Sequence, residues 1–175
     1  MRRGLGSREW PLAAAACAAL AAAFASTSLA EPVTARVAPV AVIPLPAEVT
    51  PGVGVFRLHA GVRLRVPPGD RDAAAAAHYF GELVARSRGL ALDVRTGAPS
   101  AGAIAFEHRA GLAPEAYRIE VTPQGVTVSA SSAAGLFYGA VTLWELLPPG
   151  RTGTQLAAQL IRDEPAYSWR GLMLD

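Results

Sequence analysis

Few residues of this chain have the types and spacing that catalysis requires. Asp163 and Glu164 form an adjacent pair of carboxylates, but neighbouring side chains of an extended chain point apart, which makes them a poor acid/base pair. The histidines His59, His78 and His108 are far apart and fall on separate predicted elements. The sequence has no H-E-x-x-H pair, phosphate loop or G-x-S-x-G elbow. It therefore predicts no metal site and no bound cofactor.

Arg170 stands in a different context. It directly precedes residues 172–174, a continuous apolar run typical of a strand buried on both faces. An arginine there could be a bidentate donor to sugar hydroxyls or to a carboxylate, or it could form a structural salt bridge. The residues alone leave both roles open. Because no turn, partner strand or crossover helix follows the run, we interpret it as the first strand of a larger domain.

The first thirty residues have the pattern of a secretory signal peptide. Arginines at positions 2, 3 and 8 precede an alanine-rich apolar stretch at 12–25, and small residues flank Leu29 at 28 and 30. We expect cleavage after Ala30 and a secreted product, periplasmic or extracellular. An uncleaved anchor, which would tether an interaction protein to a membrane, is the alternative, but the apolar stretch is short for a span.

The charge of the remaining chain excludes several partners. Taking three arginines and one glutamate from the 16 basic and 14 acidic residues leaves 13 of each after residue 30. The chain has no lysine and no arginine cluster there, so we expect no nucleic-acid binding. Cys17 lies inside the leader, which removes disulfides and cysteine-based metal sites. After cleavage we expect no stable membrane association.

Hydrophobic periodicity and capping residues predict nine elements. Asp70 is a suitable N-cap and Gly89 a suitable stop for the first helix, and the turn around Pro123 joins a hairpin. Gly135 and Gly139 lie one turn apart in the second helix, which indicates close backbone packing. The expected strands cover 56–59, 62–66, 90–94, 103–107, 117–122, 126–130 and 158–162, and the expected helices cover 70–88 and 132–147.

This order predicts an α+β fold, a mostly antiparallel sheet with two helices packed on one face. The predicted organisation has five parts. They are a signal peptide (1–30), an extended proline-rich lead-in (31–51), an α+β domain (52–150), a linker and junction strand (151–168), and the first strand of a further domain (169–175).

Four motifs carry a resemblance to a known family. They are V-I-P-L-P at 42–46, Y-R-I-E-V-T at 117–122, A-G-L-F-Y-G-A at 134–140 and W-R-G-L-M-L-D at 169–175, in that order. Together they resemble the N-terminal domain of β-N-acetylhexosaminidases of glycoside hydrolase family 20. The chain departs from the family at 165–167, where the family commonly has Pro-Arg-Phe and this chain has Pro-Ala-Tyr. That departure weakens one contact near the domain junction.

The resemblance implies a non-catalytic, zincin-like accessory domain, here without metal ligands, that precedes a (β/α)8 barrel. The family removes terminal N-acetylhexosamine from the non-reducing ends of glycans and chitin oligosaccharides. Its mechanism is substrate-assisted and retaining. The 2-acetamido oxygen attacks the anomeric carbon, an aspartate orients that group, and the next glutamate is general acid and then base.

The resemblance implies one substrate-binding residue in this chain. Arg170 matches the arginine of the first barrel strand, which holds hydroxyls of the terminal sugar, whereas the catalytic Asp-Glu pair matches nothing in this chain. We therefore expect this chain alone to be inactive, since a barrel needs about 250 residues. The alternative is a non-enzymatic, carbohydrate-associated scaffold or binding module. The oligomeric state, and the hexosamine and linkage preferred, stay open.

Overall fold

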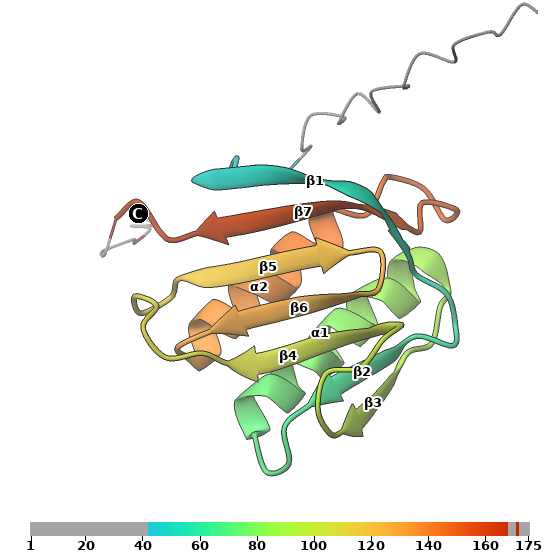
Figure 1. Ribbon diagram of the computed structural model, residues 1–175, viewed down its shortest axis with the longest axis horizontal. Helices are drawn as coiled ribbons and strands as arrows, with labels where there is room; N and C mark the ends of the chain where they lie inside the picture. The colour runs from blue at the N-terminus through green and yellow to red at the C-terminus, as the bar shows by residue number, and fades with distance from the viewer. Residues whose placement is uncertain (1–41, 168–170, 172–175) are drawn as a thin grey trace, which may run out of the picture. The chain divides into compact units, whose positions relative to one another are not determined.

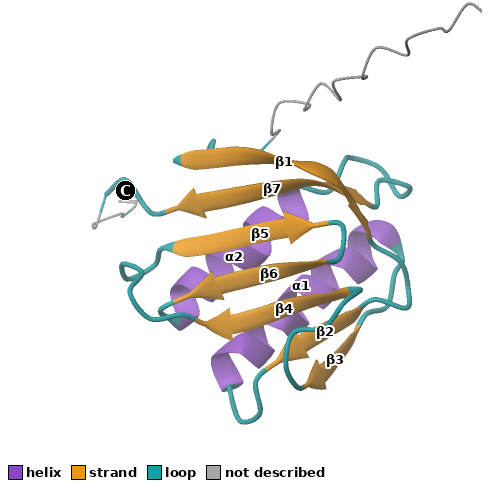
Figure 2. Ribbon diagram, in the orientation of Figure 1, coloured by secondary structure: helices purple, strands orange, loops and turns teal. Residues whose placement is uncertain are grey.

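The computed structural model describes residues 42–167 and 171. They form one seven-stranded sheet in the order β1-β7-β5-β6-β4-β2-β3, with both helices on one face (Figures 1 and 2). The strands are β1 (Glu48–Arg57), β2 (Arg63–Val66), β3 (Asp93–Thr96), β4 (Ala103–His108), β5 (Tyr117–Thr122), β6 (Gly125–Ala130) and β7 (Gln155–Asp163). The helices are α1 (Arg71–Arg88) and α2 (Ala133–Glu145). The α+β class and the two helices on one face are confirmed.

The prediction of a mostly antiparallel sheet is wrong, because the sheet is mixed. The pairs β1–β7, β7–β5 and β5–β6 are antiparallel, whereas β6–β4, β4–β2 and β2–β3 are parallel. Helix α1 makes the crossover that returns β3 parallel to β2. The loop 97–102 then passes over β2 to begin β4, and the Arg65 Nε–H donates to Ala98 O at 3.2 Å.

Two boundaries of the predicted organisation also differ. Strand β1 begins at Glu48, inside the predicted lead-in, and β7 is longer than the predicted junction strand. Strand β7 lies between β1 and β5 and pairs with both, so the segment after 150 completes the sheet instead of linking away from it. The paired residues are 98–114 positions apart between β1 and β7 and 38–46 apart between β5 and β7, which local patterns do not reveal.

The predicted helix ends are confirmed to within two residues. The Asp70 side chain accepts a 2.9 Å hydrogen bond from the Ala73 N–H, and Gly89 ends α1 with a φ of 72°. Ser132 caps α2 in the same way, accepting from the Gly135 N–H. The predicted hairpin is confirmed too, with Thr122 opposite Gly125.

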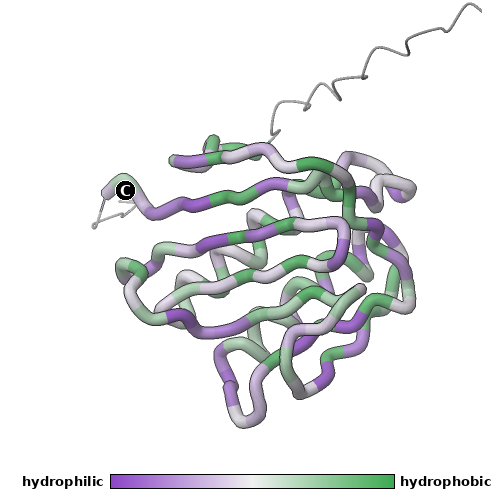
Figure 3. The backbone as a smooth tube through the Cα atoms, viewed as in Figure 1, coloured by the Kyte–Doolittle hydropathy of each residue, from purple (hydrophilic) through white to green (hydrophobic). Residues whose placement is uncertain are grey.

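The core lies between the sheet and the helices. Figure 3 shows hydrophilic and hydrophobic residues alternating along β5, as a strand with one buried face requires. The largest fully buried side chains include Phe80, Leu136 and Leu143 from the helices and Ile104, Phe106 and Ile161 from the sheet. In the part of the chain that the structure describes, neither helix is long and apolar enough to cross a membrane.

Candidate functional site

The predicted sugar-binding residue cannot be placed. Arg170 and residues 172–174 lie outside the described residues, as does the leader with Cys17. The roles assigned to them therefore stay predictions.

Asp163, at the end of β7, accepts hydrogen bonds that join β7 to two other segments. Its Oδ1 accepts from the Ala47 N–H at 3.0 Å, and its Oδ2 accepts from the Tyr117 hydroxyl at 2.7 Å. Both oxygens are thus used to join the leading segment and β5 to β7. Glu164 follows the end of the strand.

The three histidines do not share a site. His59 is exposed in the loop after β1, and His78 is exposed on α1. His108 lies at the end of β4, where its Nε2 is 3.6 Å from Asp70 Oδ1 and from Asp72 Oδ2. Within residues 42–167 and 171, no group of three or more histidine, cysteine and carboxylate ligands could hold a metal ion.

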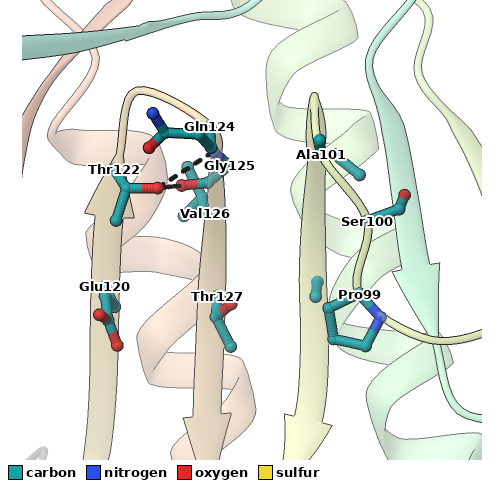
Figure 4. Close-up of a pocket in the computed structure, with 11 residues that line it drawn as sticks. Pro99, Ser100, Ala101, Glu120, Thr122, Gln124, Gly125, Val126 and Thr127 are labelled. Atoms are coloured by element: carbon teal, nitrogen blue, oxygen red, sulfur yellow. Dashed lines mark hydrogen bonds between the residues drawn. The ribbon is translucent and has the colours of Figure 1, made fainter.

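A hollow of about 410 Å³ lies on the sheet face away from the helices, between the β5–β6 turn and the loop before β4 (Figure 4). Its carboxylate, Glu120, accepts a 2.8 Å hydrogen bond from Arg118 Nη2. The hydroxyl of Thr122 is bonded to the backbone of Gly125. The other side chains that line it are small, apolar, hydroxyl or amide, and among the described residues no hydrogen bond joins the hydroxyl of Ser100 or Thr127 to a base.

A larger groove of about 610 Å³ lies where the two ends of the described chain meet α2. We call it the α2 groove. It is lined by residues 42–45 and Ala47, by residues 138, 141, 142 and 145 of α2, by Tyr117, and by residues 163–167.

The surface of the α2 groove is apolar and open. Ile43 is 89%, Leu45 70% and Tyr167 74% exposed. Helix α2 has one charged residue, Glu145, in its thirteen. A helix that is apolar on all sides is normally buried on all sides, and a large exposed apolar patch marks a surface that packs against something else.

A hydrogen-bonded group closes the base of the groove. The Tyr117 oxygen lies 2.7 Å from Thr142 Oγ1 and 2.7 Å from Asp163 Oδ2. Because its one proton goes to the carboxylate, Tyr117 accepts from the threonine hydroxyl. Burial raises the pKa of Tyr117 well above its ordinary value, so it stays a neutral donor. Burial also raises the pKa of Glu145.

Sequence reasoning did not identify this groove. The signal is in the sequence, because residues 133–145 include one charged residue, Glu145, and are therefore apolar on the face turned away from the sheet as well.

The comparisons with known proteins agree with one another. Residues 40–164 match the family model described as Glycosyl hydrolase family 20, domain 2. A β-N-acetylhexosaminidase of Cellulomonas fimi is 35% identical over 142 residues, which are 78% of this chain and 28% of that protein. The N-acetyl-β-hexosaminidase of Streptomyces plicatus is similar in structure, with a TM-score of 0.66 and 36% identity over 74% of this chain and 27% of that one. The family 20 enzyme of Streptomyces coelicolor A3(2) has the same TM-score and 35% identity.

The fold is that of an α+β domain, and its α2 groove exposes an apolar surface of the kind that packs against another protein surface. With the match over residues 40–164, the chain belongs to glycoside hydrolase family 20. It spans less than a third of the length of these relatives.

Proposed function

We propose that this chain supplies the accessory domain of a secreted β-N-acetylhexosaminidase. The observation that carries the proposal is the family match over residues 40–164, together with relatives named as hexosaminidases over most of this chain. The enzyme removes terminal N-acetylhexosamine from the non-reducing ends of glycans or chitooligosaccharides and so takes part in chitin degradation. A zincin-like domain precedes a (β/α)8 barrel, whose first strand is formed by residues 169–175.

The proposed reaction needs no carboxylate nucleophile. The substrate's own acetamido oxygen attacks the anomeric carbon while a glutamic acid protonates the leaving oxygen, and the anomeric configuration is retained after water attacks. Arg170 contributes hydrogen bonds to hydroxyls of the terminal sugar. No residue of this chain matches the aspartate and glutamate of the family, and we infer that the chain alone is inactive.

We also infer that residues 1–30 direct export and are removed after Ala30. The basic start, the short apolar stretch and the small residues before Glu31 support this. N-terminal sequencing of the protein recovered from the periplasm or medium should begin at Glu31. A protein that keeps residues 1–30 in the membrane fraction would support the tethered alternative.

A chromogenic N-acetylglucosaminide assay tests the activity. The protein made from the complete reading frame is compared with residues 31–175 purified alone. We expect turnover from the former and background rates from the latter. Turnover by residues 31–175 contradicts the inferred inactivity of the chain alone, whereas a stop codon directly after codon 175 contradicts the proposal and favours a binding module.

Arg170 is tested in the same protein by Arg170→Ala. A lost hydrogen bond to a charged donor is worth about 1.5–3 kcal/mol, so kcat/KM should fall by roughly 10- to 100-fold. Arg162→Ala, in β7, is the matched control and should leave kcat/KM within about twofold. Equal effects of the two substitutions contradict a direct sugar contact at Arg170.

A further inference from the structure

The hollow on the sheet face away from the helices has hydrogen-bonding groups that the protein itself does not use. Glu120 and Thr127 are paired across β5 and β6 and lie level with each other at its edge (Figure 4). Glu120 accepts from Arg118 through one carboxylate oxygen, Oε2, and its other oxygen has no partner among the described residues. In the same part of the chain, the Thr127 hydroxyl and the Gln124 amide group make no hydrogen bond.

Small residues and backbone contacts keep this space open. Ala103 and Ala105 of β4 line it and are buried. A Cβ on Gly125 would lie 3.0 Å from Ala103 O, so glycine permits the close approach of β6 to the start of β4. The Gly102 N–H donates to Gln124 O at 2.7 Å and holds the loop before β4 against the β5–β6 turn. The volume of about 410 Å³ is within the range of about 300–1,000 Å³ found for small-molecule sites.

The chemistry of the lining favours a neutral ligand that has many hydroxyl groups. Glu120 is the one charged residue that lines the hollow, and the Arg118 guanidinium, 2.8 Å away, balances its charge. The free carboxylate oxygen accepts hydrogen bonds, whereas the Gln124 amide and the Thr127 hydroxyl both donate and accept. The hydroxyls of a sugar ring also donate and accept, so one ring can satisfy all three groups. Pro99 and Ala103 offer apolar surface to the C–H groups of the ring.

We propose that this hollow is a second glycan-binding site, which holds sugar rings of a neutral N-acetylhexosamine polymer away from the terminal residue that is cleaved. The sugar class follows from the lining, and the choice of polymer rests on the proposed function. The free oxygen of Glu120 accepts from a ring hydroxyl or from the acetamido N–H. Thr127 and Gln124 supply the remaining hydrogen bonds.

Such a site increases retention on the polymer and takes no part in the chemical step. Each hydrogen bond at an exposed site replaces one made with water, so its net contribution is modest. We therefore expect a Kd of roughly 0.1–10 mM for a short oligosaccharide. On an insoluble polymer, a second contact made by the same protein raises its effective concentration at the chain ends.

The first test titrates chitotriose into the ¹⁵N-labelled 175-residue chain and follows the amide resonances. We expect saturable shifts in residues 99–105 and 120–127 and none in α1. Cellotriose, which has no acetamido group, is titrated in parallel and should bind at least threefold more weakly. Equal affinity for the two sugars would overturn the assignment to an N-acetylhexosamine polymer.

Three variants of the 175-residue chain locate the site. Glu120→Ala removes the acceptor, and Ala101→Leu fills the hollow from an exposed position. Both should weaken chitotriose binding at least fivefold. The matched control is Glu82→Ala, which removes a carboxylate of α1 that is likewise paired with an arginine, and its Kd should stay within twofold. An unchanged circular dichroism spectrum shows that each variant still folds.

The second test uses the protein made from the complete reading frame. Glu120→Ala should lower the fraction bound to insoluble chitin at least threefold and leave turnover of a chromogenic N-acetylglucosaminide within twofold. Loss of hexosaminidase activity from the unmodified protein would contradict the proposed function but would not affect the titration. The absence of saturable shifts up to roughly 20 mM chitotriose, or equal effects of Glu120→Ala and Glu82→Ala in folded chains, overturns the second site.

Discussion

The hydroxyl of Tyr117 donates a 2.7 Å hydrogen bond to Oδ2 of Asp163, directly across the pairing of β5 and β7. The other oxygen of the same carboxylate accepts from the Ala47 N–H. One side chain therefore joins the segment that leads into the sheet, a central strand and the end of the last strand. This arrangement holds both ends of the described chain beside α2 and shapes the α2 groove.

Replacing Tyr117 with phenylalanine should destabilise the domain. The change removes the donor to Asp163 and the acceptor for Thr142, and half-buried polar groups left without a partner cost about 1–3 kcal/mol. Urea denaturation of the 175-residue chain measures the change in the free energy of unfolding. Tyr79→Phe is the control, since its hydroxyl makes no hydrogen bond among the described residues, and should change stability by less than about 0.5 kcal/mol. Equal effects of the two substitutions would show that the hydrogen bonds of Tyr117 with Asp163 and Thr142 do not contribute to stability.

The glycines of the two helices should respond to alanine with opposite signs. A Cβ on Gly135 would overlap Ala116 O and lie 2.8 Å from the Ala130 Cβ, so Gly135→Ala should destabilise by about 1–3 kcal/mol. A Cβ on Gly81 of α1 meets its nearest atom, Leu64 Cδ1, at 3.4 Å, so Gly81→Ala should stabilise by up to about 1 kcal/mol. Thermal unfolding measures both. A stabilising Gly135→Ala would refute the close approach of α2 to the sheet.

Glu145 should make stability depend on pH. Burial raises its pKa in the folded state, so the folded protein binds this proton more tightly than the unfolded protein does. Its contribution to the free energy of unfolding is therefore most favourable at pH values below its ordinary pKa. That contribution is lost as the pH rises through the raised pKa of the folded state. Glu145→Gln should be more stable than the unmodified chain at pH 7, and the difference should shrink towards zero in acid. Urea titrations at pH 3.5, 5 and 7 check this, and a difference that grows in acid would contradict the assignment.

Much of the local structure could be read from the sequence. The cap at Asp70, the stop at Gly89 and the hairpin at Thr122 depend on residues within a few positions of one another. The i,i+4 pair Glu82–Arg86 lies within α1 and has an Nη1–Oε2 distance of 3.4 Å between the arginine and the glutamate. Interactions of this kind form inside one segment, so the residue types and their spacing are enough to predict them.

The sequence by itself determined the element order, the helix ends and the family motifs at 42–46, 117–122 and 134–140. Only the tertiary structure decided that the sheet is mixed, that β7 lies between β1 and β5, and that Asp163 joins Ala47 to Tyr117. The physical reason is that these features are hydrogen bonds between distant parts of the chain. Alternating hydrophobicity shows that a strand has a buried face, but it does not identify the neighbouring strand or its direction.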